Sequence, residues 1–173
     1  NQFSHVSPTS ASHVVSEFGE ELPVLDGGNC HVGVESTIIS CLKSVPKILR
    51  TGSVTAAQVA QLLEIPEDDL SVRDLSKIKV SGNMKIHYSP KIPVYVFHEV
   101  DDMLKYIKKN KKNKLAYMGF HDFVDEKISY KHLVNSGEEF AYKLYSFFRK
   151  AEDQNCSEII VQAPDSIGIG AAI

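Results

Sequence analysis

The sequence of 173 residues is 43% apolar and 24% charged, with a net charge of −3. This composition excludes a disordered chain, and the small negative charge argues against a protein that coats nucleic acid by bulk charge. Three cysteines, Cys30, Cys41 and Cys156, lie far apart and form no Cys-x-x-Cys pair. We therefore expect no zinc site and no disulfide framework, and a cytoplasmic protein that does not span a membrane.

The two ends of the chain lack the usual features of a complete protein. The sequence opens at Asn1 without a methionine or a targeting segment, and it closes at Ile173 where a new helix is expected to begin. We interpret the sequence as part of a larger protein.

The first 80 residues predict closely spaced strands with two helices. Ser7-Pro8 is typical of a helix start and Gly19 of a helix end. Strands are expected at 22–26, 34–40 and 47–50. Thr55 and Gln58 match a capping box that begins the second helix.

Residues 81–92 predict an extended linker, because turn-forming residues open the segment and Pro90 and Pro93 restrict the residues before them. After it, strands expected at 94–97, 115–118 and 159–161 alternate with helices expected at 100–109 and 138–152. This alternation predicts an α/β fold with a parallel sheet, a small Rossmann-like domain. The glycine-containing stretch 167–172 then follows a strand end, where such sheets place ligands. The expected domains are therefore 1–80 and 93–173.

Two segments of the first domain carry polar residues suited to binding, and a purely structural interpretation stays open for each. The stretch from Asn1 to Thr9 leads into a helix N-terminus, which can hold phosphate or carboxylate or can simply be capped. Ser36 and Thr37 are neighbours on an expected strand, so at most one of them faces a given ligand. Hydroxyls in strands are usually structural.

Three further segments carry charged or aromatic candidates. Arg50 ends an expected strand before a glycine turn, where its planar fork suits phosphate but also suits a surface ion pair. His87 and Tyr88 in the linker can stack on a ligand or merely anchor the linker. Six lysines between 105 and 114 fit either an RNA-phosphate patch or, more simply, the solvated end of a helix.

Four motifs, taken in order, resemble one family. They are Asn-x-x-x-x-x-Ser-Pro-Thr at 1–9, Leu-Asp-Gly-Gly with Val-Gly-Val-Glu-Ser-Thr-Ile at 25–38, Ile-Leu-Arg-x-Gly at 48–52, and Ser-Gly followed by His-Tyr-Ser-Pro at 81–90. They resemble the carboxyl-terminal half of a YrdC-type domain with its exit linker. Residues 93–173 resemble the additional Rossmann-like domain of long, Sua-type members. The chain thus resembles the threonylcarbamoyl-AMP synthase family, without the amino-terminal half of the YrdC-type domain.

The resemblance implies a nucleotidyltransferase that makes threonylcarbamoyl-AMP and pyrophosphate from L-threonine, bicarbonate and ATP, with Mg²⁺ accompanying the ATP. The product would serve threonylcarbamoyladenosine modification of tRNA through downstream tRNA threonylcarbamoyl transferase proteins. No protein nucleophile is implied, because catalysis is positioning and charge neutralisation. The residues implied for the nucleotide are Asn1, Thr9, Arg50, His87 and Tyr88, the last two as part of a lid. Those implied for threonine are Ser36 and Thr37.

The sequence also departs from the family. Thr51 stands where the family often has proline. The basic motif of the family's amino-terminal half and the Asn-Asp-Arg motif after the closing glycines are absent, so this chain alone is expected to be inactive. A non-enzymatic RNA-binding YrdC-like module is the alternative, and the ten acidic against six basic residues of 1–80 count against it. The second domain counts against a carbamoyltransferase, and a contact with tRNA is left open.

Overall fold

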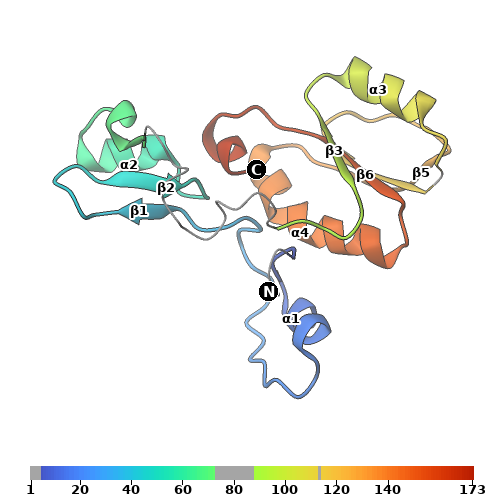
Figure 1. The fold of residues 1–173 in the computed structure, drawn as a ribbon, viewed down its shortest axis with the longest axis horizontal. Helices are drawn as coiled ribbons and strands as arrows, with labels where there is room; N and C mark the ends of the chain where they lie inside the picture. The colour runs from blue at the N-terminus through green and yellow to red at the C-terminus, as the bar shows by residue number, and fades with distance from the viewer. Residues whose placement is uncertain (1–4, 73–87, 113) are drawn as a thin grey trace.

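The computed structural model describes residues 5–72, 88–112 and 114–173. Figure 1 shows two parts that contain strands, one formed by residues 38–70 and the other by residues 94–173, with the helix of residues 11–18 below them. None of the described helices is long and apolar enough to cross a membrane.

Residues 94–173 form a parallel sheet between two helices. Its strands are β3 (Val94–Phe97), β4 (Leu115–Gly119), β5 (Ile128–Leu133) and β6 (Glu158–Gln162), in the order β3-β6-β4-β5. All three neighbouring pairs are parallel. The helices are α3 (Val100–Lys109) and α4 (Gly137–Asp153). The predicted α/β class with a Rossmann-like parallel sheet is confirmed.

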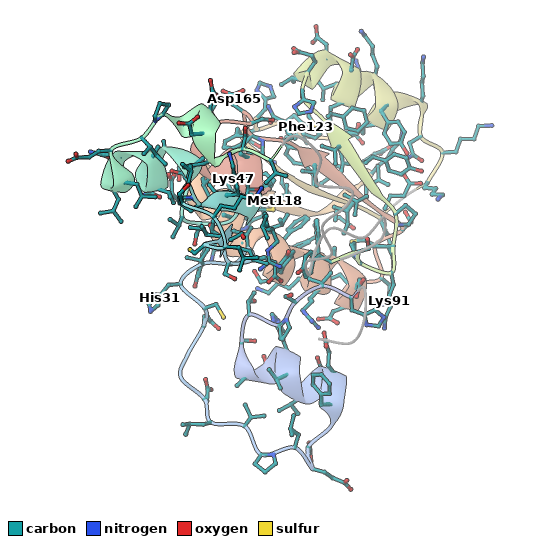
Figure 2. All side chains as sticks on the ribbon, turned by 60° about the vertical axis from the view of Figure 1, so that its left-hand side comes forward. His31, Lys47, Lys91, Met118, Phe123 and Asp165 are labelled. Atoms are coloured by element: carbon teal, nitrogen blue, oxygen red, sulfur yellow. The ribbon has the colours of Figure 1, made fainter. Side chains whose placement is uncertain are left out.

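The alternation of side chains along β4 explains why a helix covers each face of the sheet. Ala116 and Met118 pack in one core cluster with residues of α4, whereas Leu115 and Tyr117 pack in a second cluster with residues of α3. All four are fully buried. Figure 2 shows Met118 among the packed side chains of the molecule, while His31 stands at its outside. A strand buried on both faces is typical of a central parallel strand.

Residues 38–70 form a smaller unit with its own core. β1 (Ile38–Ser40) pairs antiparallel with β2 (Lys47–Arg50), and α2 (Ala56–Leu63) and the 3₁₀ helix η1 (Glu67–Leu70) cover the pair. The buried side chains of this core are Ile48, Val59, Ala60 and Leu70. The predicted capping box is confirmed, because the Thr55 side chain accepts from the Gln58 amide and the Gln58 side chain accepts from the Thr55 amide.

Several expected elements differ in the structure. Residues 22–26 form no strand, and the expected strand at 34–40 is regular only over Ile38–Ser40. The first helix, α1 (Ala11–Phe18), begins after Ser10, whose side chain accepts from the amide of His13, rather than after Ser7. Pro8 therefore precedes the helix, and none of the residues of α1 is buried. β5 was not predicted, although its first four residues, 128–131, alternate between apolar and polar as a half-buried strand does.

Three contacts join the amino-terminal residues to the parallel-sheet part. Val6 is buried in the core cluster that contains α4. Arg149 of α4 forms a largely buried ion pair with Glu17 of α1 and donates to the carbonyl of Val6. Gly33 lies so close to α4 that a Cβ atom there would come within 2.4 Å of the carbonyl oxygen of Ala141. The segment before β1 is therefore held against α4.

Candidate functional site

Arg50, the last residue of β2, lies at the centre of a polar cluster. Its Nε donates to the backbone carbonyl of Ser36 at 3.0 Å, and its Nη2 donates to the Ser36 hydroxyl at 3.1 Å. Its Nη1 donates to the hydroxyl of Tyr88 at 3.1 Å. The side chain is only 13% exposed. These contacts fix the plane of the guanidinium group, as a group that recognises a planar anion requires.

A carboxylate and a second hydroxyl extend this cluster. Glu35 Oε2 lies 3.8 Å from Arg50 Nη2, and Ser7 Oγ donates to Glu35 Oε1 at 2.5 Å. The glycine after the Arg50 strand makes this arrangement possible. A Cβ atom on Gly52 would lie 2.3 Å from the Thr37 amide nitrogen and 2.5 Å from the Glu35 carbonyl oxygen. Only glycine lets the turn approach the 35–37 backbone so closely.

Tyr88 brings the linker to the same cluster. Its backbone has a φ of 52°, in the left-handed region that few residues other than glycine adopt. Its ring lies 5.9 Å from the ring of Tyr145 on α4, measured between centroids. Burial raises the pKa of the Tyr88 phenol and the Glu35 carboxylate raises it further, although Arg50 opposes both effects. The hydroxyl therefore stays protonated near neutral pH.

The structure brings together three of the seven residues implied for binding, Ser36, Arg50 and Tyr88. The Thr37 hydroxyl instead donates to the carbonyl of Val54 at 2.6 Å. This fits the expectation that only one of the two neighbouring hydroxyls faces a given ligand. Asn1 and His87 lie outside the described residues.

Thr9 is buried, and it contacts a residue of α1 and the segment around residue 30. Its backbone amide donates to His13 Nδ1 at 3.2 Å, and its hydroxyl lies 3.2 Å from the same nitrogen. Its carbonyl accepts from the amide of Cys30 at 2.9 Å. The contacts of Thr9 therefore hold the residues around 30 against the start of α1.

An apolar pocket of about 360 Å³ borders the cluster on the side of the parallel sheet. Tyr88 and Tyr145 form one wall, and Val94 and Val96 of β3 with Val161 of β6 form another. Within the described residues, no three His, Cys, Asp or Glu side chains gather as metal ligands do. A fixed cation, hydroxyls and an apolar surface are the features of a site for an anionic ligand with an organic part.

Sequence reasoning missed three members of this cluster. Ser7 and Glu35 both lie inside the motifs that carry the resemblance, so those motifs could have indicated them. Tyr145 had no such signal, because it lies in α4, where the neighbouring residues Leu144 and Phe148 indicate only a core-facing helix. Only the packing of α4 against the linker reveals it.

The lysine-rich segment is remote from Arg50 in the fold. It occupies the last turns of α3 and the residues before β4. Lys112 pairs at 2.7 Å with the buried carboxylate of Glu158, and Lys105 pairs with Asp102. At least these two lysines have structural partners.

The chain is similar to known proteins over nearly its whole length. A family model described as "Threonylcarbamoyl-AMP synthase, C-terminal domain" matches residues 54–173, and one described as "Telomere recombination" matches residues 1–52. Relatives named threonylcarbamoyl-AMP synthase are 26% identical in Bacillus subtilis and 25% identical in Pyrococcus abyssi, each over 96% of this chain. These matches cover 51% and 52% of those proteins. The chain spans about half the length of the curated relatives it matches.

Solved structures show the same fold. The crystal structure of P. abyssi Sua5 complexed with L-threonine matches with a TM-score of 0.77 and 24% identity, over 99% of this chain and 53% of that one. A variant of that protein, in which a histidine and the following tyrosine are replaced by alanine, matches with a TM-score of 0.75 and 23% identity, over 98% of this chain and 51% of that one.

Proposed function

The chain belongs to the threonylcarbamoyl-AMP synthase family, and from this premise we propose that the protein makes threonylcarbamoyl-AMP and pyrophosphate from L-threonine, bicarbonate and ATP. The observation that carries the proposal is the guanidinium group of Arg50, held by Ser36 and Tyr88 beside an apolar pocket. The shared name of the relatives supports the synthase rather than the RNA-binding alternative.

The proposed reaction suits a site that holds a fixed cation. The amine of threonine combines with bicarbonate, with loss of water, to give an N-carboxylated threonine. Its new carboxylate attacks the α-phosphorus of ATP, and an O–P bond forms as the bond to the pyrophosphate oxygen breaks. Pyrophosphate leaves with the electron pair. The negative charge on the phosphate oxygens favours a preorganised cation such as Arg50, so that positioning and charge neutralisation suffice without a protein nucleophile.

The individual roles that we propose are those that the family resemblance implies. We assign Arg50 to the ATP phosphates, Ser36 to threonine and Tyr88 to the nucleotide. The resemblance implies a threonine contact for Thr37 as well. Because the Thr37 hydroxyl donates to the carbonyl of Val54, we propose that Thr37 also holds Ser36 in position. Asn1, Thr9 and His87 complete the proposed nucleotide site. The His-Tyr dipeptide occurs once in this sequence, at 87–88, and a relative has been studied with such a pair replaced.

The domain division proposed here is 1–80, 81–92 and 93–173. The small core shared by β2, α2 and η1 supports it, because a boundary near residue 53 would separate Ile48 from Val59 and Leu70. Mg²⁺ is proposed to enter with ATP as a substrate complex. We also propose that the protein is cytoplasmic and that its product passes to tRNA threonylcarbamoyl transferase proteins.

The test uses the full-length protein with ATP, Mg²⁺, L-threonine and ¹³C-labelled bicarbonate. Mass spectrometry should detect threonylcarbamoyl-AMP carrying one labelled carbon, together with pyrophosphate release that requires threonine. Pyrophosphate release without threonine, or a threonine adenylate without the labelled carbon, would overturn the proposal.

A further inference from the structure

The helix α4 of the parallel-sheet part reaches the Arg50 cluster through one side chain. Tyr145 is 6% exposed, and its ring lies 5.9 Å from the ring of Tyr88 with an angle of 33° between the two planes. The hydroxyl of Tyr88 in turn accepts from Arg50 Nη1 at 3.1 Å. A continuous chain of contacts therefore runs from α4 to the guanidinium group.

The packing of Tyr145 on Tyr88 matters because of the backbone conformation of Tyr88. A tyrosine with a φ of 52° is in an unfavourable conformation that persists only where the surroundings hold it. The Tyr145 ring and the Arg50 guanidinium both contact the Tyr88 side chain. Loss of the Tyr145 ring would let Tyr88 relax towards a common backbone conformation, and its hydroxyl would then leave Arg50.

Electrostatics keeps both phenols in the form that this arrangement needs. Burial raises the pKa of Tyr145, and the Glu35 carboxylate and Tyr88 raise it further. Burial and Glu35 raise the pKa of Tyr88 as well. Both hydroxyls remain neutral near pH 7, so the Tyr88 oxygen accepts from Arg50 as a phenol.

We propose that Tyr145 is a positioning residue for the synthase reaction, which holds Tyr88 so that Arg50 keeps the orientation that binds the phosphates of ATP. This inference rests on the proposed function. It gives the parallel-sheet part a role in substrate binding, because Tyr145 acts on Arg50 through Tyr88. A second contact of that part, from the Thr51 hydroxyl to the carbonyl of Ala171 at 3.0 Å, holds the residue after Arg50.

The test compares three single variants of the full-length protein by pyrophosphate release and by thermal unfolding. Tyr145→Met keeps bulk and apolar packing but removes the ring, and Tyr145→Phe keeps the ring. The matched control is Tyr130→Met, because Tyr130 stacks on Phe147 of the same helix at 4.9 Å and has no contact with the Arg50 cluster among the described interactions. If Tyr145→Met does not fold, Tyr145→Leu replaces it.

We expect Tyr145→Met to raise KM for ATP by about tenfold with a much smaller change in kcat, because a hydrogen bond to a charged group is lost. Tyr145→Phe should behave as the unmodified protein, and Tyr130→Met should change only the unfolding midpoint. In a Tyr88→Phe background, which lacks the acceptor for Arg50, Tyr145→Met should raise KM by a much smaller factor than it does in the unmodified protein.

Two results would overturn the inference while the proposed function stands. One is an active protein in which Tyr145→Met and Tyr130→Met both lower the midpoint and leave KM unchanged. The other is an increase in KM from Tyr145→Met that is fully retained in the Tyr88→Phe background. A full-length protein that releases no pyrophosphate with threonine would instead refute the proposed function, and the inference with it.

Discussion

Arg50 is the last residue of β2, and its side chain contacts Ser36 in the segment before β1. Two of its donors contact Ser36 and a third contacts Tyr88, so its position is fixed before any ligand arrives. Preorganisation of this kind lowers the cost of binding, because the side chain has little rotamer freedom left to lose. The nearby carboxylate of Glu35 balances the charge of the unliganded site at a distance of 3.8 Å, too long for a strong hydrogen bond.

Replacement of Arg50 by alanine should weaken the use of ATP more than it weakens the fold. Loss of a charge-assisted contact costs about 1.5–3 kcal/mol, which corresponds to an increase of about 10- to 150-fold in KM for ATP. Lys47→Ala, at the other end of the same strand, is the matched control, since it also removes one positive charge from β2. A large drop in the unfolding midpoint with unchanged ATP affinity in Arg50→Ala would mean that Arg50 is structural.

Removal of the Ser36 hydroxyl should affect substrate binding, whereas removal of the Thr37 hydroxyl should affect stability. Ser36→Ala should raise KM for threonine, because the Ser36 hydroxyl faces the Arg50 cluster. Thr37→Val should mainly lower stability, because the Thr37 hydroxyl donates to a backbone carbonyl. The free energy of unfolding should fall by about 0.5–1.5 kcal/mol, which lowers the unfolding midpoint. Steady-state kinetics and thermal unfolding of both variants check this, and the reverse pattern would contradict the assignment.

Among the elements, the lysine-rich end of α3 should be dispensable for the chemistry, although one lysine contributes to stability. Replacement of Lys108, Lys109 and Lys111 by glutamine should leave pyrophosphate release unchanged at saturating substrates. Lys112→Gln should lower the unfolding midpoint, because it removes the positive charge that pairs with the buried Glu158 carboxylate. Loss of turnover in the triple variant would restore the RNA-binding or regulatory interpretation of this segment.

His13 of α1 is partly buried near Arg149 of α4. Burial lowers the pKa of His13 below its ordinary value of 6.5, and the nearby Arg149 lowers it further. Glu17 and Asp153 oppose this shift but do not reverse it. The unfolded chain therefore takes up a proton at a higher pH than the folded chain, so that stability from neutral His13 is present above pH 6.5 and falls as the pH drops below it.

His13→Asn should flatten this pH dependence, because asparagine can accept from the Thr9 amide but does not titrate. The free energy of unfolding, measured by urea at pH 7 and at pH 5.5, should fall less in His13→Asn than in the unmodified protein. Part of the fall should remain, since burial also lowers the pKa of His132. An equal fall in the two proteins would show that His13 takes up its proton at the same pH in the folded and the unfolded state.

Strong periodicity or a defined cap allowed sequence reasoning to predict some elements correctly. The broad apolar face of α4 and the capping box of α2 are examples, and both are confirmed. Residues 22–26 were predicted as a strand because they are apolar, but in the structure they find no partner strand and stay irregular. Pairing partners come from tertiary structure, which a local pattern does not contain.

For the whole molecule, the candidate site combines segments that are distant in the sequence. Ser7, Glu35 with Ser36, Arg50, Tyr88 and Tyr145 come from five separate stretches. The resemblance implied Ser36 for threonine and Arg50 and Tyr88 for the nucleotide, yet nothing in the motifs predicted that α4 would support the cluster. The close approach of Gly33 to α4 and the Thr51–Ala171 hydrogen bond show how the two parts meet around β2.

The crystal structure of the full-length protein with L-threonine and a non-hydrolysable ATP analogue tests the central assignment most directly. We expect a phosphate oxygen within hydrogen-bond distance of the Arg50 guanidinium group, threonine next to the Ser36 hydroxyl and the Tyr88 ring over the nucleotide. Both ligands bound elsewhere, with the contacts of Arg50 to Ser36 and Tyr88 unchanged, would contradict the assignment.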